Sequence, residues 1–290
     1  MGRLGVVFGA LIIAGSSVVA ACGHGDEGRR AVAEPAVASG GAANDAGLRH
    51  APTDTTASPA PAEAPAVPPA QVERLLVPGD LVASIVRAKD GAAPLTVFMP
   101  GMCSNGNAYL QTFPEAARRQ GGVVAIEGDQ ACGVEGFRTF SWDAARQHAR
   151  VEAALAAAGL TQIPREGITL VGYSQGAALA EQMVQRWPGR YARVVLIGAP
   201  TDPSPRNLAR ARAVVTMSCS LDVPARMKQA AQATSRAGVP ATYFEMSGCR
   251  HGNVADPERI FDAAFDWLRA NERAPDPRAE AVQIAGSPAS

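Results

Sequence analysis

The chain has 290 residues, of which 47% are hydrophobic and 19% are charged. This length and composition suffice for one sizeable core of α/β type. Its 27 basic and 27 acidic residues give a formal net charge of zero, without any basic run. Because a nucleic-acid-binding protein needs clustered cations to neutralise phosphates, nucleic acid is not an expected partner.

The N-terminus has the pattern of an export signal. Arg3 is followed by an apolar stretch at 4–14, and small residues at 19–21 precede Cys22. The apolar stretch is too short to span a bilayer, so the segment is interpreted as a signal peptide that is removed. Its end at a cysteine resembles the lipobox of bacterial lipoproteins.

The resemblance to a lipoprotein implies that residues 1–21 are cleaved off and that Cys22 becomes the acylated first residue of the mature chain. The membrane is then a partner through this lipid, because acyl chains bury methylene groups in the bilayer. Gly23, in place of an aspartate, favours the outer membrane by resemblance to the enterobacterial sorting rule. The expected location is the bacterial cell envelope, with secretion after cleavage nearby as the alternative.

Two flanking segments have a composition that cannot form a core. Residues 22–70 are rich in Ala, Pro and Gly, and residues 273–290 are small and polar. Such segments bury too little apolar surface to fold and behave as spacers. We interpret the first as a disordered tether, with a binding tail as the alternative, and the second as a flexible tail. The folded domain is expected at 71–272.

Short apolar runs alternate with amphipathic segments throughout this domain. Continuous apolar strands separated by helices indicate an α/β fold, with a mostly parallel sheet and helices on both faces. The expected strands lie at 81–86, 95–99, 123–126, 168–171, 194–197, 214–217 and 241–246.

Two helices are clear from the spacing of their apolar residues. The segment 142–159 carries an apolar stripe that includes His148. The segment after Pro257 has its apolar residues at helical spacing, and Asp256 precedes it as the expected N-cap. The connection between the strands near 197 and 214 is too short for a sizeable cap domain, so an open site is expected.

The motif Gly172-Tyr173-Ser174-Gln175-Gly176 joins an expected strand to a helix-like segment. A strand that turns abruptly into a helix forces its central residue into strained dihedral angles, and flanking glycines avoid the clash of a Cβ atom. Ser174 is therefore the candidate nucleophile. A chance match in a chain with 29 glycines is the alternative.

An activated serine needs a general base and an acid that orients this base. Of the four histidines, His24 and His50 lie in the tether and His148 lies on the apolar stripe of a helix. His251 follows the last expected strand by a short loop and precedes the last helix. His251 is therefore the candidate base.

The acid should come from a loop at the same sheet edge. Asp222 follows the expected strand at 214–217 and is preferred, Asp202 after the preceding strand is the alternative, and Asp256 is explained as a helix cap. Ser174, Asp222 and His251 then follow their own strands in the order typical of an α/β-hydrolase.

Residues 79–271 resemble a compact α/β-hydrolase, and the motif around Ser174 is similar to that of cutinases and small carboxylesterases. The resemblance implies a serine hydrolase without a cofactor, which cleaves a small or polymeric carboxylic ester through an acyl-enzyme. A thioesterase or peptidase of the same fold is an alternative. An alternative from another functional class is a non-catalytic envelope protein that keeps the fold as a binding or scaffold module.

The resemblance also implies an oxyanion hole made of two backbone N–H groups. One belongs to Gln175, directly after the nucleophile, and by position the other belongs to Met102 in the loop after an early strand. Many relatives have His-Gly where this chain has Pro100-Gly101, so the turn glycine is kept and the histidine is not. Because the hole uses backbone groups, this departure need not abolish it.

Export favours disulfide bonds among the cysteines that remain when Cys22 is set aside. These are Cys103, Cys132, Cys219 and Cys249. Of the three possible pairings, we favour Cys219 with Cys249, since Cys219 lies three residues before the candidate acid and Cys249 two residues before the candidate base. Cys103 with Cys132 would then attach the oxyanion loop to the segment after the next strand. A cysteine nucleophile or a metal site is the alternative, but no Cys-x-x-Cys or ligand-spaced histidine indicates a metal.

Overall fold

The computed structural model describes residues 68–275. The predicted signal peptide, Cys22, nearly all of the tether and nearly all of the tail lie outside the described residues. Within 68–275, none of the helices has the length and apolar character needed to cross a bilayer.

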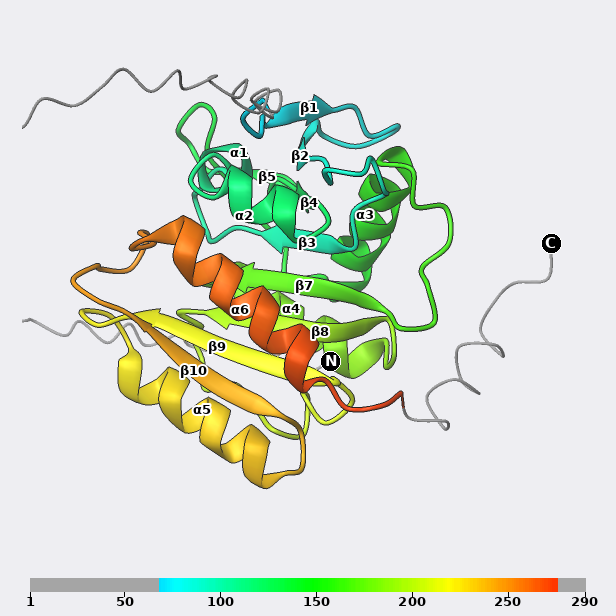
Figure 1. The fold of residues 1–290 in the computed structure, drawn as a ribbon. Coiled ribbons are helices and arrows are strands. Elements are labelled where there is room, and N and C mark those ends of the chain that lie inside the picture. The colour runs from blue at the N-terminus through cyan, green and yellow to red at the C-terminus, as the bar shows by residue number, and fades with distance from the viewer. Residues whose placement is uncertain (1–67, 276–290) are drawn as a thin grey trace, which may run out of the picture. The chain divides into compact units, whose positions relative to one another are not determined.

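An eight-stranded sheet forms the centre of the fold (Figure 1), in the order β1-β2-β4-β3-β7-β8-β9-β10. β2 runs antiparallel to both of its neighbours, β1 and β4, and all other neighbouring strands are parallel. The prediction of a mostly parallel sheet is confirmed. The strands are β1 (Glu73–Leu75), β2 (Ala83–Val86), β3 (Thr96–Met99), β4 (Val123–Ala125), β7 (Ile168–Tyr173), β8 (Tyr191–Ile197), β9 (Ala213–Cys219) and β10 (Ala241–Met246).

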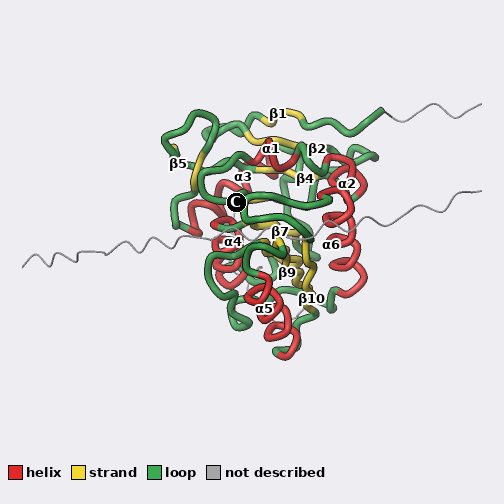
Figure 2. Tube along the Cα trace, turned by 90° about the vertical axis from the view of Figure 1, so that its left-hand side faces the viewer, coloured by secondary structure: helices red, strands yellow, loops and turns green. Residues whose placement is uncertain are grey.

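Helices cover both faces of the sheet, as predicted (Figure 2). The helices α3, α4 and α5 pack on one face and α1, α2 and α6 on the other, each with its own buried apolar cluster. Their bounds are α1 (Gly106–Leu110), α2 (Pro114–Arg119), α3 (Ala144–Ala157), α4 (Gln175–Arg186), α5 (Pro224–Arg236) and α6 (Pro257–Asn271). A separate hairpin consists of β5 (Gln130–Ala131) and β6 (Arg138–Thr139).

The buried strands explain why the sequence has continuous apolar runs. In β3, Val97 and Met99 belong to the core under α3 and α4, whereas Phe98 belongs to the core under α2 and α6. Successive side chains of a strand point to opposite faces, so a sheet covered on both sides needs apolar residues at every position. The continuous apolar runs therefore mark the strands, and the candidate site lies at the carboxyl ends of the parallel ones.

The elements that the sequence did not indicate are short or weakly apolar. Strands β1 and β5 are largely exposed and have only three and two residues. Helix α5 buries mostly small side chains, so its apolar stripe is faint. Asp256 occupies the N-cap position of α6 as predicted, but its carboxylate makes no capping hydrogen bond and pairs with Arg259 instead.

Candidate active site

Ser174 lies at the turn between β7 and α4 with φ 52° and ψ −114°. A positive φ is strained for a serine, and such strain persists only where the surroundings impose it. The flanking glycines are required by space: a Cβ at Gly172 would lie 2.3 Å from the Gly176 carbonyl oxygen, and one at Gly176 would lie 2.2 Å from the Met99 carbonyl oxygen. The turn therefore presents the serine hydroxyl at the edge of the sheet.

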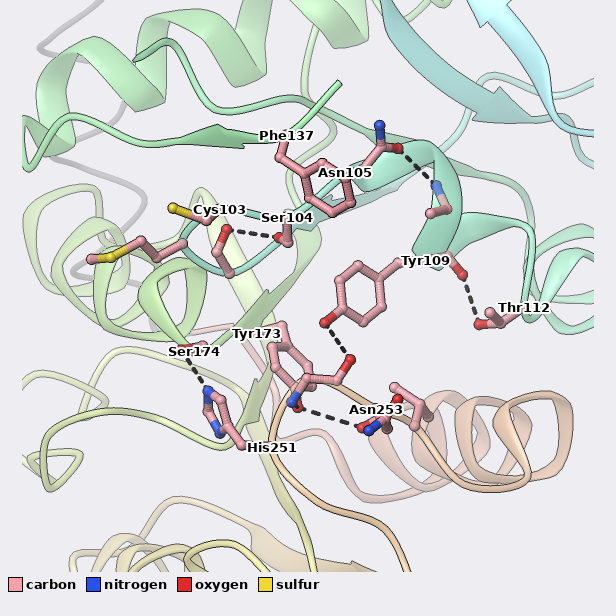
Figure 3. A pocket seen from close by; sticks show the side chains of 15 residues that line it. Cys103, Ser104, Asn105, Tyr109, Thr112, Phe137, Tyr173, Ser174, His251 and Asn253 are labelled. Carbon is pink, nitrogen blue, oxygen red and sulfur yellow. Dashed lines mark hydrogen bonds between the residues drawn. The ribbon is translucent and has the colours of Figure 1, made fainter. Parts of the chain in front are cut away.

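The structure brings Ser174, His251 and Asp222 together in one hydrogen-bonded chain. His251 Nε2 lies 2.9 Å from Ser174 Oγ (Figure 3), and His251 Nδ1 lies 2.8 Å from Asp222 Oδ2. The Asp222 side chain is 11% exposed and the His251 side chain 45%. With the Nδ1 proton directed at this mostly buried carboxylate, Nε2 is free to accept the proton of the serine.

The alternative acid, Asp202, and the helical His148 lie elsewhere. The Asp202 carboxylate pairs with Arg226 and its side chain is 90% exposed. The His148 ring stacks on Trp187 at 3.9 Å, and its Nδ1 lies 2.5 Å from the Tyr191 hydroxyl. Burial lowers the pKa of His148, as expected for a neutral histidine with satisfied contacts.

Several contacts hold the acid loop against the base loop. The disulfide Cys219–Cys249, with a Cα–Cα distance of 5.0 Å, joins the two loops in the pairing favoured from the sequence. The Ser220 N–H also donates to the Met246 carbonyl oxygen at 2.8 Å. Gly198, at φ 52°, leaves room for the pair, because a Cβ there would lie 2.9 Å from Asp222 Oδ2. The role of Gly198 was not predicted, although a glycine directly after a buried strand could have indicated it.

Two tyrosines fix the peptide that follows His251. The Tyr173 hydroxyl accepts a hydrogen bond from the Gly252 N–H at 2.6 Å, and the Tyr109 hydroxyl donates to the Gly252 carbonyl oxygen at 2.9 Å (Figure 3). Burial raises the pKa of Tyr173 to about 12 and raises the pKa of Tyr109 as well. Both hydroxyls therefore stay protonated at neutral pH. Neither role was predicted from the sequence, although Tyr173 stands inside the motif.

Gln175, the predicted oxyanion donor, is held by its own side chain. Its Oε1 accepts from Thr139 Oγ1 at 2.9 Å and from the Phe140 N–H at 3.0 Å, and its Nε2 donates to the Phe140 carbonyl oxygen at 2.8 Å. Because Gln175 begins α4, its backbone N–H belongs to the unpaired N–H groups of a helix start. Among residues 68–275, no acceptor is bonded to this N–H or to that of Met102.

The loop that carries Met102 is anchored close to the nucleophile. A Cβ at Gly101 would lie 3.1 Å from the Ser174 Cβ. Cys103, at φ 51°, forms a disulfide with Cys132 in the β5–β6 hairpin, which is the remaining pairing expected from the sequence. Ser104 exchanges backbone hydrogen bonds with Arg138 of β6 at 3.0 and 3.1 Å. The loop is thus fixed to a hairpin that the sequence did not reveal.

A carboxylate after β4 fixes the start of α1, directly behind this loop. Glu127 accepts hydrogen bonds from the backbone N–H groups of Gly106 at 3.0 Å and Asn107 at 3.1 Å. Burial raises the pKa of Glu127, and the two hydrogen bonds oppose this effect. Because α1 carries Tyr109, Glu127 helps to place the tyrosine that holds the peptide after His251.

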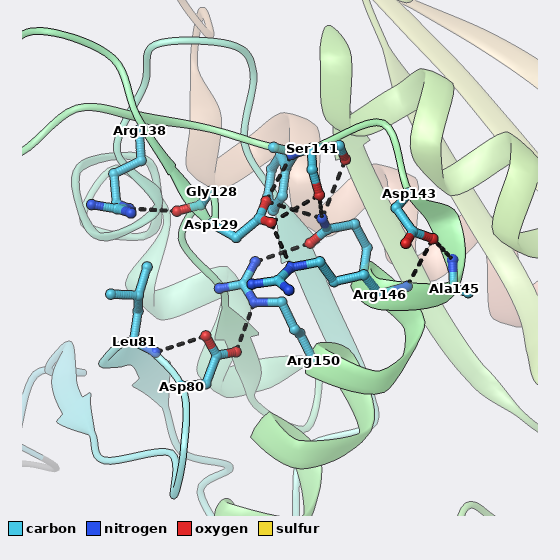
Figure 4. Close-up of polar contacts among 12 residues, drawn as sticks. Asp80, Leu81, Gly128, Asp129, Arg138, Ser141, Asp143, Ala145, Arg146 and Arg150 are labelled. Atoms are coloured by element: carbon cyan, nitrogen blue, oxygen red, sulfur yellow. Dashed lines mark hydrogen bonds and ion pairs between the residues drawn. The ribbon is translucent and has the colours of Figure 1, made fainter.

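A second carboxylate, Asp129, organises the segment that contacts Gln175 (Figure 4). It accepts from the Ser141 N–H at 2.7 Å and hydroxyl at 2.8 Å, from Gln147 Nε2 at 3.0 Å, and pairs with Arg146 at 2.7 Å. Burial alone would raise the pKa of Asp129, but the hydrogen bonds from Ser141 and Gln147 lower it to about 2. Asp129 is therefore an anionic anchor for the loop that precedes α3.

A pocket of about 420 Å³ opens beside Ser174. It lies between the Met102 loop with α1 on one side and the loop after His251 on the other, and Tyr109, Tyr173 and Phe137 contribute aromatic rings (Figure 3). Within the described part of the chain, no three His, Cys, Asp or Glu side chains gather in a way that could hold a metal ion. The side chains of Ser174, His251 and Asp222 can perform acid–base and nucleophilic chemistry.

Removal of either disulfide is expected to lower the free energy of unfolding by about 3 to 4 kcal/mol, because each bond closes a loop of similar length in the unfolded chain. The sequence separations are 30 for Cys219–Cys249 and 29 for Cys103–Cys132. Urea unfolding of the double variants Cys219→Ser/Cys249→Ser and Cys103→Ser/Cys132→Ser would measure the loss. A loss below about 1 kcal/mol in both would contradict a stabilising role.

The fold has many counterparts among solved structures, although no protein-family model matches the chain and no curated protein matches it in sequence. An esterase of Pyrobaculum calidifontis is 15% identical, with a TM-score of 0.51 over 70% of this chain and 86% of that one. A predicted CIB-like hydrolase of Thermoplasma acidophilum is 15% identical, with a TM-score of 0.52 over 69% and 98%. A fluorophosphonate-binding serine hydrolase of Staphylococcus aureus is 12% identical, with a TM-score of 0.51 over 69% and 99%. The chain has the α/β-hydrolase fold.

Proposed function

We propose that the protein is a serine hydrolase that cleaves carboxylic esters through an acyl-enzyme on Ser174. The observation that carries the proposal is the chain of two hydrogen bonds, 2.9 and 2.8 Å long, from Ser174 through His251 to Asp222. The solved structures of similar fold include a protein named as an esterase and one named as a fluorophosphonate-binding serine hydrolase. These names support an ester as the bond that is cleaved.

The proposed reaction uses the three side chains and two backbone N–H groups. Ser174 Oγ attacks the acyl carbon while its proton moves to His251 Nε2, and Asp222 stabilises the imidazolium that forms. The N–H groups of Met102 and Gln175 donate to the oxyanion. His251 then returns the proton to the departing alcohol, and water repeats the sequence to release the acid.

The approach to the site favours a small ester or an exposed chain of a polymeric ester. The connection between β8 and β9 contains neither a helix nor a strand, so no cap domain arises there. The His251 side chain is 45% exposed and Ser174 is half-buried, so both are within reach of solvent. Attachment to the cell envelope through Cys22 stays a prediction from the sequence.

A fluorophosphonate probe tests the proposal, since it reacts with activated serines. The full chain should be labelled, and Ser174→Ala should not be. With p-nitrophenyl acetate, Ser174→Ala should lower kcat by about 10⁴- to 10⁶-fold. Absence of labelling in the folded wild type would leave a non-catalytic module of this fold, and equal labelling of Ser174→Ala would show that the probe reacts with another residue and so remove the evidence for Ser174 as the nucleophile. Comparison of an ester, a thioester and an amide of one acyl group would identify the bond.

A further inference from the structure

The lining of the pocket beside Ser174 includes three aromatic side chains and no carboxylate, lysine or arginine. The pocket volume is about 420 Å³, and the rings of Tyr109, Phe137 and Tyr173 line it together with small residues of the neighbouring loops (Figure 3). A charged substrate group would lose its hydration there without gaining a counter-charge, which is costly. The lining therefore favours an uncharged group.

Most polar side chains of the lining already have partners within the protein. Ser104 Oγ and Thr112 Oγ1 each donate to a backbone carbonyl oxygen at 2.7 Å. The Asn105 side chain binds two backbone groups, at 2.7 and 2.9 Å. The two tyrosine hydroxyls are bonded to the Gly252 peptide. What these residues offer to a ligand is mainly their apolar surface.

Two aromatic residues of the lining pack against each other and against the core, with their rings tilted. The ring centroids of Tyr109 and Tyr173 lie 5.2 Å apart, and the fully buried Phe98 lies behind Tyr109 at 5.4 Å. The hydrogen bonds to the Gly252 peptide hold both tyrosines in this position. The packed rings leave no room for a long acyl chain between Tyr109, Tyr173 and Phe98, so a compact group fits better.

We propose that this pocket binds an uncharged aromatic group of the ester, in contact with Phe137 and Tyr109, with the almost fully buried Tyr173 packed against Tyr109. The inference rests on the proposed ester hydrolysis and names its substrate class. Aromatic rings pack on one another in offset or edge-to-face geometry with a gain beyond the area they bury. The ring can belong to the acid or to the alcohol of the ester, since both lie next to Ser174 during attack.

Pairs of esters that differ only in aromaticity test this assignment. For the acid side, ethyl 3-phenylpropanoate is compared with ethyl 3-cyclohexylpropanoate, and for the alcohol side benzyl acetate is compared with cyclohexylmethyl acetate. We expect kcat/KM to favour the aromatic member of one pair by about five- to tenfold, and that pair identifies the side. Monoethyl succinate and ethyl palmitate should both be poorer substrates than the favoured ester.

A matched pair of variants assigns the effect to the pocket. Phe137 is 45% exposed on the β5–β6 hairpin, and Val134 is 62% exposed on the same hairpin but does not line the pocket. Phe137→Leu should reduce the aromatic preference at least about threefold, and Val134→Ala should leave it unchanged. The test applies to an enzyme that is labelled by fluorophosphonate and cleaves ethyl butyrate. In that enzyme, the inference would be overturned if kcat/KM were nearly equal for the two members of both ester pairs. It would also be overturned if Phe137→Leu left the aromatic preference unaltered. An unlabelled, inactive wild type would instead overturn the proposed function.

Discussion

Asp222→Asn is expected to lower kcat by about four orders of magnitude without loss of the fold. The carboxylate lies 2.8 Å from His251 Nδ1 and fixes the proton on that nitrogen. Asparagine has almost the same shape, but its amide can donate to Nδ1 and so favour the tautomer with the proton on Nε2. That tautomer cannot accept the proton of Ser174. The rate of ester hydrolysis measures the effect, and circular dichroism checks that the variant is folded.

Asp202→Asn is the matched control for this prediction. Asp202 also follows a strand of the sheet, but its side chain is 90% exposed and pairs with Arg226. Loss of an exposed ion pair changes stability little, so kcat should stay within about twofold of the wild type. A large loss in Asp202→Asn together with a small one in Asp222→Asn would reverse the assignment of the acid.

The residues of the hydrogen-bonded chain could be predicted because parallel strands order them. Ser174, Asp222 and His251 each follow a buried strand, and the carboxyl ends of parallel strands meet at one edge of the sheet. The apolar runs were long enough to locate those ends within a few residues. Asp222 and Asp202 both follow a strand, so position alone left Asp202 as an alternative; in the structure His251 Nδ1 lies 2.8 Å from Asp222, and Asp202 pairs with Arg226.

The supporting contacts could not be predicted because they join segments far apart in the chain. Tyr109 reaches the Gly252 peptide across a sequence separation of 143, and Gln175 reaches Phe140 across 35. Such contacts depend on how loops pack, and the spacing of apolar residues in the sequence does not predict loop packing. Asp256 illustrates the same limit, since its place before α6 was clear whereas the direction of its carboxylate was set by Arg259.

Gly176→Ala is expected to destabilise the protein by about 3 kcal/mol, because backbone atoms surround the position and an added methyl group overpacks it. A Cβ at this position would lie 2.2 Å from the Met99 carbonyl oxygen and 2.6 Å from that of Pro100. Relief of the clash requires α4 to move away from the end of β3. Urea unfolding measures the loss of stability, and ester hydrolysis at urea concentrations below the unfolding transition measures kcat.

The same movement should separate the two N–H groups of the proposed oxyanion hole. Gln175 begins α4 and Met102 follows β3, so a shift of α4 against β3 changes their spacing, and kcat should fall by about 100-fold or more. Gly238→Ala is the control: at φ 85° its Cβ meets nothing within 4 Å, so it should cost about 1 kcal/mol from the positive φ alone and leave kcat unchanged. If Gly176→Ala loses stability but keeps its kcat, the contact between α4 and β3 serves the fold alone, and the oxyanion donors must be sought elsewhere.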